Sequence, residues 1–271
     1  MTPPAAAPTS RDIEAFAQLA GRLADVARLE ILPRFRTGIA VDAKSDASPV
    51  TEADRAAERA MRALIGETYP GHGILGEEYG PENTDAEYVW VLDPIDGTNS
   101  FVTGKPLFGT LVALCRLGRP IVGVIDAPGV NERWVGAAGL PTTLNGEAVR
   151  TRALAELDRA WLYATTPDMF KGADRDAFAR LSGAAWRTVY GGDCYAYGLL
   201  ASGHVDLVCE ASLGTYDYCA LAPVVEGAGG VFTDWAGAPV DLDTDGRVLA
   251  AGNAALHARA LAVLRGSEDG A

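Results

Sequence analysis

The sequence contains few histidines, few cysteines and no long apolar run. Its 271 residues include three histidines and four cysteines, and no two cysteines form a CxxC pair. We therefore expect neither a zinc site of histidine and thiolate ligands nor a disulfide framework. No stretch approaches the roughly 20 consecutive apolar residues that a membrane helix needs, so no membrane partner is expected. The cysteine pattern favours the reducing cytoplasm.

Basic residues are also scarce. The chain has 23 Lys and Arg against 36 Asp and Glu, which gives a formal net charge of -13. No local basic patch interrupts this excess, so nucleic acid is not an expected partner. The N-terminal stretch has no basic segment followed by an apolar core and does not predict a secretory signal. Any metal ion bound by such a chain is expected to be a hard cation with oxygen ligands.

The distribution of apolar residues divides the chain into a tail and two parts. The first dozen residues are rich in proline and alanine. Beyond about Leu144, strand patterns alternate with helix patterns, which is typical of a layered α/β fold. We expect a flexible tail over residues 1–10, an N-terminal α+β domain over 11–143 and a C-terminal α/β domain over 144–271.

Helical and strand patterns predict the elements around the candidate site. At the start of one helix, Thr51 and Asp54 have the spacing of a capping box. The spacing predicts helices over Arg11–Arg34 and Thr51–Thr68, a strand over Tyr88–Leu92 and a single helix over Tyr216–Ala228.

The stretch WVLDPIDGTNSF places two aspartates, Asp93 and Asp96, at a strand end. Pro94 restricts Asp93 to extended geometry, so both carboxylates leave the strand in defined directions. Gly97 permits a close approach of the backbone to a ligand, and a helix beginning near Thr98 would offer free N–H groups to an anion. Carboxylates beside an anion site are compatible only if cations bridge them, as in a phosphate held by Mg²⁺. The alternative is a turn with Asx-type caps.

Two further acidic residues could contribute ligands to this predicted metal site. Glu77, in LGEEYG, follows a short strand, and two consecutive strand ends can bring it to the edge that holds Asp93 and Asp96. Asp217, in TYDYCALAPVVEGAGG, stands at a predicted helix start. Taken alone, adjacent glutamates are usually solvated surface charge, and an aspartate at a helix start is usually a cap. Both alternatives stay open for the individual residues.

These three segments, in this order and at these separations, resemble the inositol monophosphatase family of Mg²⁺-dependent phosphatases. The resemblance extends from about Asp12 to Leu264. It implies a sugar-phosphatase fold of the α/β class with αβαβα layers, and a homodimer that acts on a small-molecule phosphate monoester. It also implies two to three Mg²⁺ ions per site, with Mn²⁺ as an alternative ion.

The resemblance assigns the metal ligands residue by residue. Glu77, Asp93 and the backbone carbonyl of Ile95 would hold the first ion. Asp93, Asp96 and Asp217 would hold the second, and a third, weaker ion would contact Glu77. Glu77 is therefore counted among the catalytic residues as well as among the ligands.

The resemblance also assigns residues to the reaction. In the family, a water on the first metal attacks phosphorus, oriented by the residues that match Thr98 and Asp54. Gly97 and Thr98 would offer backbone N–H groups to the phosphate. Lys44 and Glu78 match positions close to the site and are expected to contact substrate.

A second set of residues bears on substrate choice. The segments GGDCYAYG and VDLVCEA resemble the histidinol-phosphate phosphatase branch of the family. In this branch-like segment the chain has Asp193, where general inositol phosphatases have a small residue. Histidinol phosphate carries a protonated amine and an imidazole, for which Asp193 and Glu210 are suitable partners. The family also uses a glutamate at the position of Glu210 to contact inositol hydroxyls, so only Asp193 discriminates. The alternative for Asp193 is a helix N-cap after Gly191-Gly192.

The expected function is Mg²⁺-dependent hydrolysis of L-histidinol phosphate in histidine biosynthesis. The nearest alternative is a broad-specificity inositol monophosphatase. Fructose bisphosphatase and nucleotide 3′-phosphatase activities rank lower, because the insertions and basic residues for a second phosphate are not evident. A binding partner in transcription complexes would predict a damaged metal site, whereas all the carboxylates are present. No P-loop pattern and no Ser-His-Asp set is apparent.

Overall fold

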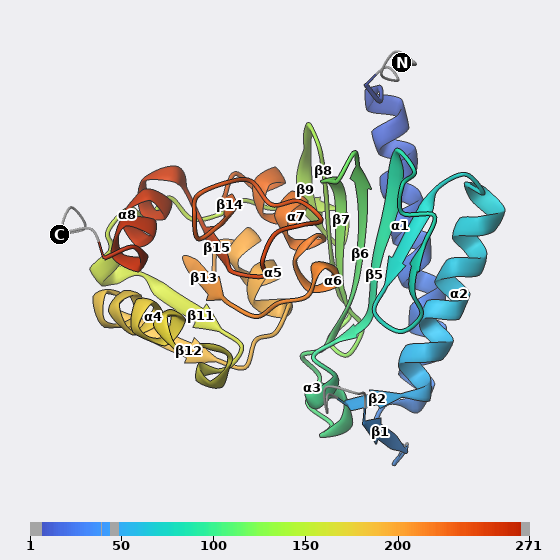
Figure 1. Ribbon diagram of the computed structural model, residues 1–271, viewed down its shortest axis with the longest axis horizontal. Coiled ribbons are helices and arrows are strands. Elements are labelled where there is room, and N and C mark those ends of the chain that lie inside the picture. Colours follow the sequence, from blue (N-terminus) through green and yellow to red (C-terminus); the bar gives the residue numbers. More distant parts are fainter. Residues whose placement is uncertain (1–6, 39, 44–48, 267–271) are drawn as a thin grey trace.

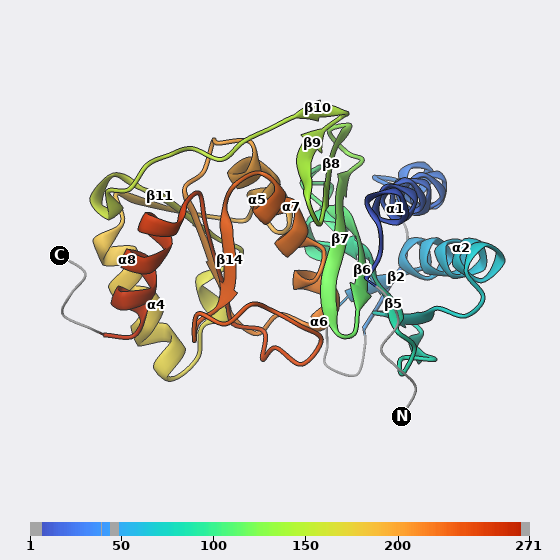
Figure 2. The same ribbon diagram turned by 90° about the horizontal axis from the view of Figure 1, so that it is seen from above.

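The computed structural model describes residues 7–38, 40–43 and 49–266. Lys44, expected near the site, lies outside these ranges. The chain forms five layers in the order αβαβα, which confirms the predicted fold class (Figure 1). A view from above follows the layers through both sheets (Figure 2). The outer layers are α1 (Ser10–Ile31) with α2 (Glu52–Thr68), and α4 (Ala173–Ala184) with α8 (Ala254–Leu264).

The first helical layer covers one face of the larger sheet. α1 and α2 pack against each other and, with the sheet, enclose a core to which Leu23 and Trp90 both contribute. The 3₁₀ turn η1 (Leu32–Arg34) follows α1. As predicted, Thr51 is the N-cap of α2 and forms a capping box with Asp54. This cap fixes Asp54 at the end of α2 that faces the candidate site.

The larger sheet has eight strands in the order β10-β9-β8-β7-β6-β5-β3-β4. β3 and β5 are parallel neighbours, so their carboxyl ends meet at the same edge. The strands are β3 (Gly73–Gly76), β4 (Gly80–Glu82), β5 (Tyr88–Asp96), β6 (Gly109–Arg116), β7 (Arg119–Ala127), β8 (Glu132–Ala137), β9 (Leu140–Leu144) and β10 (Glu147–Ala148), with a separate ribbon of β1 (Val41–Ala43) and β2 (Pro49–Thr51).

The smaller sheet has five strands in the order β12-β11-β13-β15-β14. Its strands are β11 (Trp161–Ala164), β12 (Arg187–Tyr190), β13 (Leu207–Glu210), β14 (Val231–Asp234) and β15 (Val248–Ala251). Between the two sheets lie α5 (Tyr195–Ala201), α6 (Thr215–Tyr218) and α7 (Leu221–Gly227) (Figure 1). The 3₁₀ turns η2 (Leu157–Arg159) and η3 (Pro167–Met169) flank β11.

The single helix predicted over Tyr216–Ala228 was wrong. The segment forms α6 and α7, with an interruption between Tyr218 and Leu221. Pro223 explains the interruption, because proline has no N–H to donate to the carbonyl of Cys219 and its ring clashes with that carbonyl. The interruption gives Asp217 a short helix of its own.

Strands β9 and β10 of the larger sheet extend to Ala148. The expected boundaries at residues 10 and 143 stay predictions. The four cysteines are buried and free. Within the described ranges, no helix is both long and apolar enough to cross a bilayer.

Candidate active site

A bulge in β5 brings two aspartates together. The pairing of β5 with β6 shifts between Asp93 and Asp96. On a regular strand, residues three apart point to opposite faces, so this bulge redirects one side chain. The carbonyl left free at Pro94 accepts a hydrogen bond from Thr110 Oγ1 (2.8 Å). One oxygen each from Asp93, Asp96 and Asp217 then lies within 4.8 Å of the others.

Glu77 reaches the same place from the neighbouring strand. It follows β3, and its backbone N–H donates to the carbonyl of Leu92 (3.1 Å), the residue before Asp93. Glu77 contributes electrostatically to the raised pKa of Asp93, which places the two acids close together. The prediction that two strand ends unite Glu77 with the aspartates is therefore consistent with the parallel pairing of β3 and β5.

Glu58 on α2 is a residue that sequence reasoning missed. Its fully buried carboxylate accepts hydrogen bonds from the backbone N–H groups of Glu78 (2.7 Å) and Tyr79 (3.2 Å). Arg62 Nε donates to the same carboxylate at 2.8 Å. These bonds anchor the turn after β3, which carries Glu77.

Gly76 leaves room for that anchor. A Cβ atom at Gly76 would lie 1.9 Å from Glu58 Oε1, so any other residue would displace the carboxylate. One signal for Glu58 exists in the sequence. It stands four residues after Asp54 and therefore on the same face of α2.

The three aspartates repel one another in a setting that is buried at Asp93 and half-buried at Asp96 and Asp217. Asp93 is 2% exposed, and its pKa lies well above the usual range because of burial and the charges of Glu77, Asp96 and Asp217. Burial, followed by Asp193 and Asp217, also raises the pKa of Asp96, although the N–H of Cys194 donates to Asp96 Oδ2 at 2.6 Å. Burial raises the pKa of Asp217 to about 7, although the N–H of Gly214 donates a hydrogen bond to Asp217 Oδ2 and lowers this pKa.

Two carboxylate oxygens at this site have no partner. Among the described residues, the buried side-chain polar atoms without a hydrogen bond are Asp54 Oδ1 and Asp93 Oδ1. A buried unpaired carboxylate oxygen is costly, so both atoms indicate a missing cationic or donor ligand. The donor set is entirely oxygen, which suits a hard divalent cation. The residues therefore fit a metal ion.

Asp54 and Thr98 are held in defined orientations. Asp54 Oδ2 accepts hydrogen bonds from the N–H (2.8 Å) and Oγ1 (2.6 Å) of Thr51, which leaves Oδ1 for a ligand. Burial, and to a smaller extent Glu77, raises the pKa of Asp54. Thr98 Oγ1 donates to the carbonyl of Ile95 (3.0 Å), the carbonyl that the family resemblance assigns to a metal ion.

Gly97 is required by its conformation and by its surroundings. It is the N-cap of α3 (Thr98–Val102), with a φ of 78° in the left-handed region. A Cβ atom there would lie 3.1 Å from the carboxylate carbon of Asp193. Gly97, in the turn predicted to bind phosphate, therefore lies against Asp193, the residue predicted to contact the leaving group.

A cavity of about 80 Å³ joins the two groups of acids. Its lining brings Asp193 and Glu210 together with two of the clustered aspartates. The residues that line it are Asp96, Thr165, Met169, Asp193, Cys194, Tyr197, Glu210, Leu213, Asp217 and Leu221. Glu78 is not among them; its carboxylate acts electrostatically on Arg55, and its assignment to substrate stays a prediction.

The two acids at the far side of the cavity are both hydrogen-bonded. Glu210 accepts from the N–H of Thr165 (2.7 Å) and the hydroxyl of Tyr197 (2.9 Å), and burial raises its pKa. Asp193 Oδ2 accepts from Ser100 Oγ (2.9 Å). Burial raises the pKa of Asp193 as well.

The structure does not support the cap alternative for Asp193. No side chain caps α5, whose N-cap residue is Cys194. Ser100 and Lys105 both oppose the rise in the pKa of Asp193. Sequence reasoning missed these two partners, because they are about 90 residues away in the chain and no local pattern links them to Asp193.

Comparisons with known proteins agree with this geometry. Residues 12–268 match the inositol monophosphatase family. The chain is 47% identical over 259 residues to the bifunctional phosphatase IMPL2, chloroplastic, of Arabidopsis thaliana, with 92% of this chain and 75% of that protein covered. It is 39% identical over 224 residues to the histidinol-phosphatase of Mycobacterium tuberculosis, with 79% and 85% covered.

The fold agrees with a solved structure of an inositol monophosphatase from Zymomonas mobilis. The TM-score is 0.87 at 46% identity, with 95% of this chain and 100% of that chain covered. The acidic cluster, the fold and the matched residues lead to one conclusion: the chain belongs to the inositol monophosphatase family and is a phosphatase, hence a hydrolase, of that family.

Proposed function

We propose that this phosphatase hydrolyses L-histidinol phosphate to L-histidinol and phosphate, with Mg²⁺ as its metal ion. The observation that carries the proposal is the cavity lining, in which Asp193 and Glu210 face the same space as Asp96 and Asp217. A leaving group with an ammonium and an imidazole would neutralise acids that a polyol would leave uncompensated. The similarity to the histidinol-phosphatase of M. tuberculosis supports the same substrate.

The residues that would hold the metal are those of the acidic cluster. Asp93, Asp96 and Asp217, with Glu77 and the carbonyl of Ile95, would bind two Mg²⁺ ions, and a third would contact Glu77. When bound, the ions supply positive charge that lowers the pKa of water and stabilises the phosphate oxygens.

The protein's own groups orient the reactants. Thr98 donates its hydroxyl hydrogen to Ile95, so the oxygen of Thr98 is left to accept a hydrogen bond from the attacking water. Asp54 Oδ1, which has no partner in the fold, would accept the proton of that water. The backbone N–H groups of Gly97 and Thr98 would bind the phosphate oxygens. No protein nucleophile is required.

The leaving group would contact Asp193 and Glu210. Ser100 occupies Oδ2 of Asp193, and Oδ1 would pair with the ammonium group. Both oxygens of Glu210 are oriented by Thr165 and Tyr197, which holds the carboxylate rigid for an imidazole N–H or a hydroxyl. Asp193 therefore determines specificity, while Glu210 suits either substrate.

The alternative function is a broad-specificity inositol monophosphatase. The similarity at 46% identity to the Z. mobilis inositol monophosphatase favours it. Hydrolysis of another small phosphate ester and a role as a transcription-complex partner rank below these two functions.

We also propose that the protein works as a cytoplasmic homodimer on small phosphate monoesters. Its formal net charge of -13 argues against nucleic acid as a partner. Light scattering after size exclusion would test the dimer, and a monomer at micromolar concentration would contradict it.

The test of the proposed function is phosphate release with Mg²⁺ from histidinol phosphate and from inositol 1-phosphate, compared as kcat/KM. We expect a preference for histidinol phosphate. Asp193→Asn keeps the size of the side chain but removes its charge, and should raise KM for histidinol phosphate about tenfold with little effect on inositol 1-phosphate. Equal effects on both substrates, or a preference for inositol 1-phosphate, would overturn the proposal.

A further inference from the structure

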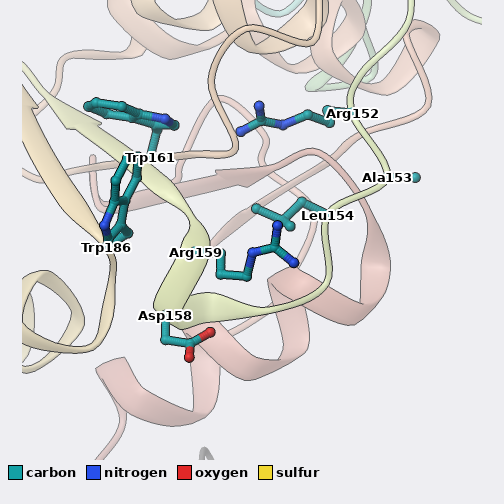
Figure 3. Close-up of a pocket in the computed structure, with 7 residues that line it drawn as sticks. All are labelled: Arg152, Ala153, Leu154, Asp158, Arg159, Trp161 and Trp186. Carbon is teal, nitrogen blue, oxygen red and sulfur yellow. The ribbon is translucent and has the colours of Figure 1, made fainter.

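A second cavity, of about 660 Å³, lies at the other end of β11. Figure 3 shows its lining, which consists of Arg152, Ala153, Leu154, Asp158, Arg159, Trp161 and Trp186. Trp161 is the first residue of β11, whereas Thr165, just after its last residue, lines the candidate substrate cavity. The two cavities share no lining residue. The second cavity is thus separate from the active site.

One wall of this cavity is aromatic. The rings of Trp161 and Trp186 meet edge to face, with centroids 4.8 Å apart. Trp186 is 50% exposed, which is unusual for so large an apolar side chain. Its backbone is fixed, because its N–H donates to the carbonyl of Ala160 (3.1 Å). The two indoles therefore form a partly uncovered aromatic surface, and the guanidinium of Arg187 lies 5.5 Å from the centroid of the Trp186 ring.

The facing side is cationic, and one of its charges is held in place. Arg152 Nε donates to Asp206 Oδ1 (2.8 Å), and Nη2 donates to Oδ2 of the same residue. Asp206 is fully buried and also accepts the N–H of Trp161 (2.8 Å). This arrangement fixes the guanidinium of Arg152 beside the aromatic wall before any ligand arrives.

Arg159 supplies a charge that the fold does not neutralise. No described residue forms an ion pair with it. Asp158 is the one acid in the lining, and within the described ranges no ion pair joins it to Arg152 or Arg159. In a chain with 36 acids and 23 basic residues, an unpaired arginine beside exposed indoles is an unusual local combination.

We propose that this cavity binds a small anion that carries a planar aromatic ring. The ring would stack on Trp186 and Trp161, and the carboxylate or phosphate group would pair with Arg159 and the free edge of Arg152. The volume is in the range of small-molecule sites, roughly 300–1,000 Å³. This second site goes beyond the proposed function and does not depend on it.

The test uses the Mg²⁺-loaded protein and ligands that no phosphatase can hydrolyse. Phenylphosphonate, phenylacetate and phenethylamine share one ring and differ in charge. The ¹⁵N-labelled protein has five indole N–H signals, which Trp→Phe variants assign. We expect saturable shifts of the Trp161 and Trp186 signals with the two anions, no shift of the buried Trp90 and Trp134 signals, and no binding of phenethylamine.

The relative affinities of the two anions distinguish a phosphorylated ligand from a carboxylic acid. Tighter binding of phenylphosphonate indicates a phosphorylated ligand, and tighter binding of phenylacetate indicates a carboxylic acid. Arg159→Ala should weaken binding of the anions about tenfold, because a charge-assisted hydrogen bond is lost. Arg22→Ala, an exposed arginine on α1, is the matched control and should change nothing.

Three outcomes would overturn the proposal. The first is no saturable shift with either anion up to about 10 mM, the concentration at which a millimolar Kd is detected. The second is equal binding of phenethylamine. The third is a changed oligomeric state of Trp186→Ala, measured by light scattering, together with no anion effect on Trp161, since Trp186 would then be an interface residue.

Discussion

Two buried aspartates in the same sheet have opposite surroundings. Asp126 on β7 accepts hydrogen bonds from Arg28 Nε (2.6 Å) and Nη2 (2.8 Å) and from Arg133 Nε (2.6 Å). Asp93 on β5 has acids as its charged neighbours, and its Oδ1 has no partner in the described structure. Both side chains are almost completely buried.

This is the difference expected between an acid that stabilises the fold and one that binds a metal ion. Burying a carboxylate is costly unless a cation accompanies it. Around Asp126 the chain supplies two arginines, so the acid is complete within the fold. Around Asp93 the chain adds further carboxylates, so the compensating positive charge must come from a ligand outside the protein. We therefore take the unpaired carboxylates, not burial by itself, as the mark of the proposed metal site.

The largest expected effect comes from Asp93→Asn, which removes the proposed bridging carboxylate. Loss of such a ligand should cost several kcal/mol, or about a thousandfold in kcat at saturating Mg²⁺. The far-UV circular dichroism should be unchanged. Retention of more than about a tenth of the wild-type kcat would refute the bridging role.

The second prediction compares the stability of the two aspartate variants. Asp126→Asn leaves two arginines without their charge partner and should lower the free energy of unfolding by about 3 kcal/mol. In metal-free protein, Asp93→Asn removes a buried carboxyl group whose charged neighbours are acids, and should not lower the free energy of unfolding. Urea unfolding in EDTA measures both. Equal destabilisation by the two substitutions would contradict the distinction between the sites.

The third prediction concerns Glu58, which anchors the turn that carries Glu77. Glu58→Gln weakens its bonds to the turn and to Arg62, and should lower the apparent Mg²⁺ affinity about tenfold. The kcat at saturating Mg²⁺ should change less. Glu82→Gln, which alters the exposed partner of Arg62, is the control. A fall in kcat with an unchanged Mg²⁺ requirement would exclude a positioning role.

The smallest effect is the pH dependence of stabilisation by Mg²⁺. The pKa of Asp217 is about 7 in the metal-free fold, above its usual value of about 4, so the folded state binds more protons than the unfolded state between these values. Metal-free stability therefore falls as pH rises through this window, and Mg²⁺ replaces the lost protons. The increase in Tm caused by Mg²⁺ should be larger at pH 8 than at pH 6, by scanning calorimetry. An increase that is larger at pH 6 would contradict this coupling.

Much of the fold follows from local patterns in the sequence. The capping box of Thr51 and Asp54 and the strand before Asp93 were predicted because caps and apolar runs act over a few residues. The parallel neighbours β3 and β5 place Glu77 beside Asp93, which the order of the strand ends already indicated. The cluster of Asp93, Asp96 and Asp217 was predicted on the same basis together with the family resemblance.

Other features depend on contacts between distant segments. The strands β8, β9, β10 and β15 were not predicted, because short strands in turn-rich sequence lack a clear alternation. The anchoring by Glu58 needs the turn at Gly76 to approach α2. The hydrogen bond from Ser100 to Asp193 joins residues that are 93 positions apart. The periodic patterns that predict helices and strands carry no information about such a distant pair.

The most direct test of the central claim is the location of Mn²⁺ in crystals soaked with that ion, by anomalous scattering. The account predicts peaks coordinated by Asp93, Asp96 and Asp217, and none beside Asp126. An empty acidic cluster at saturating Mn²⁺ would contradict the claim that the unpaired carboxylates form the metal site of this phosphatase.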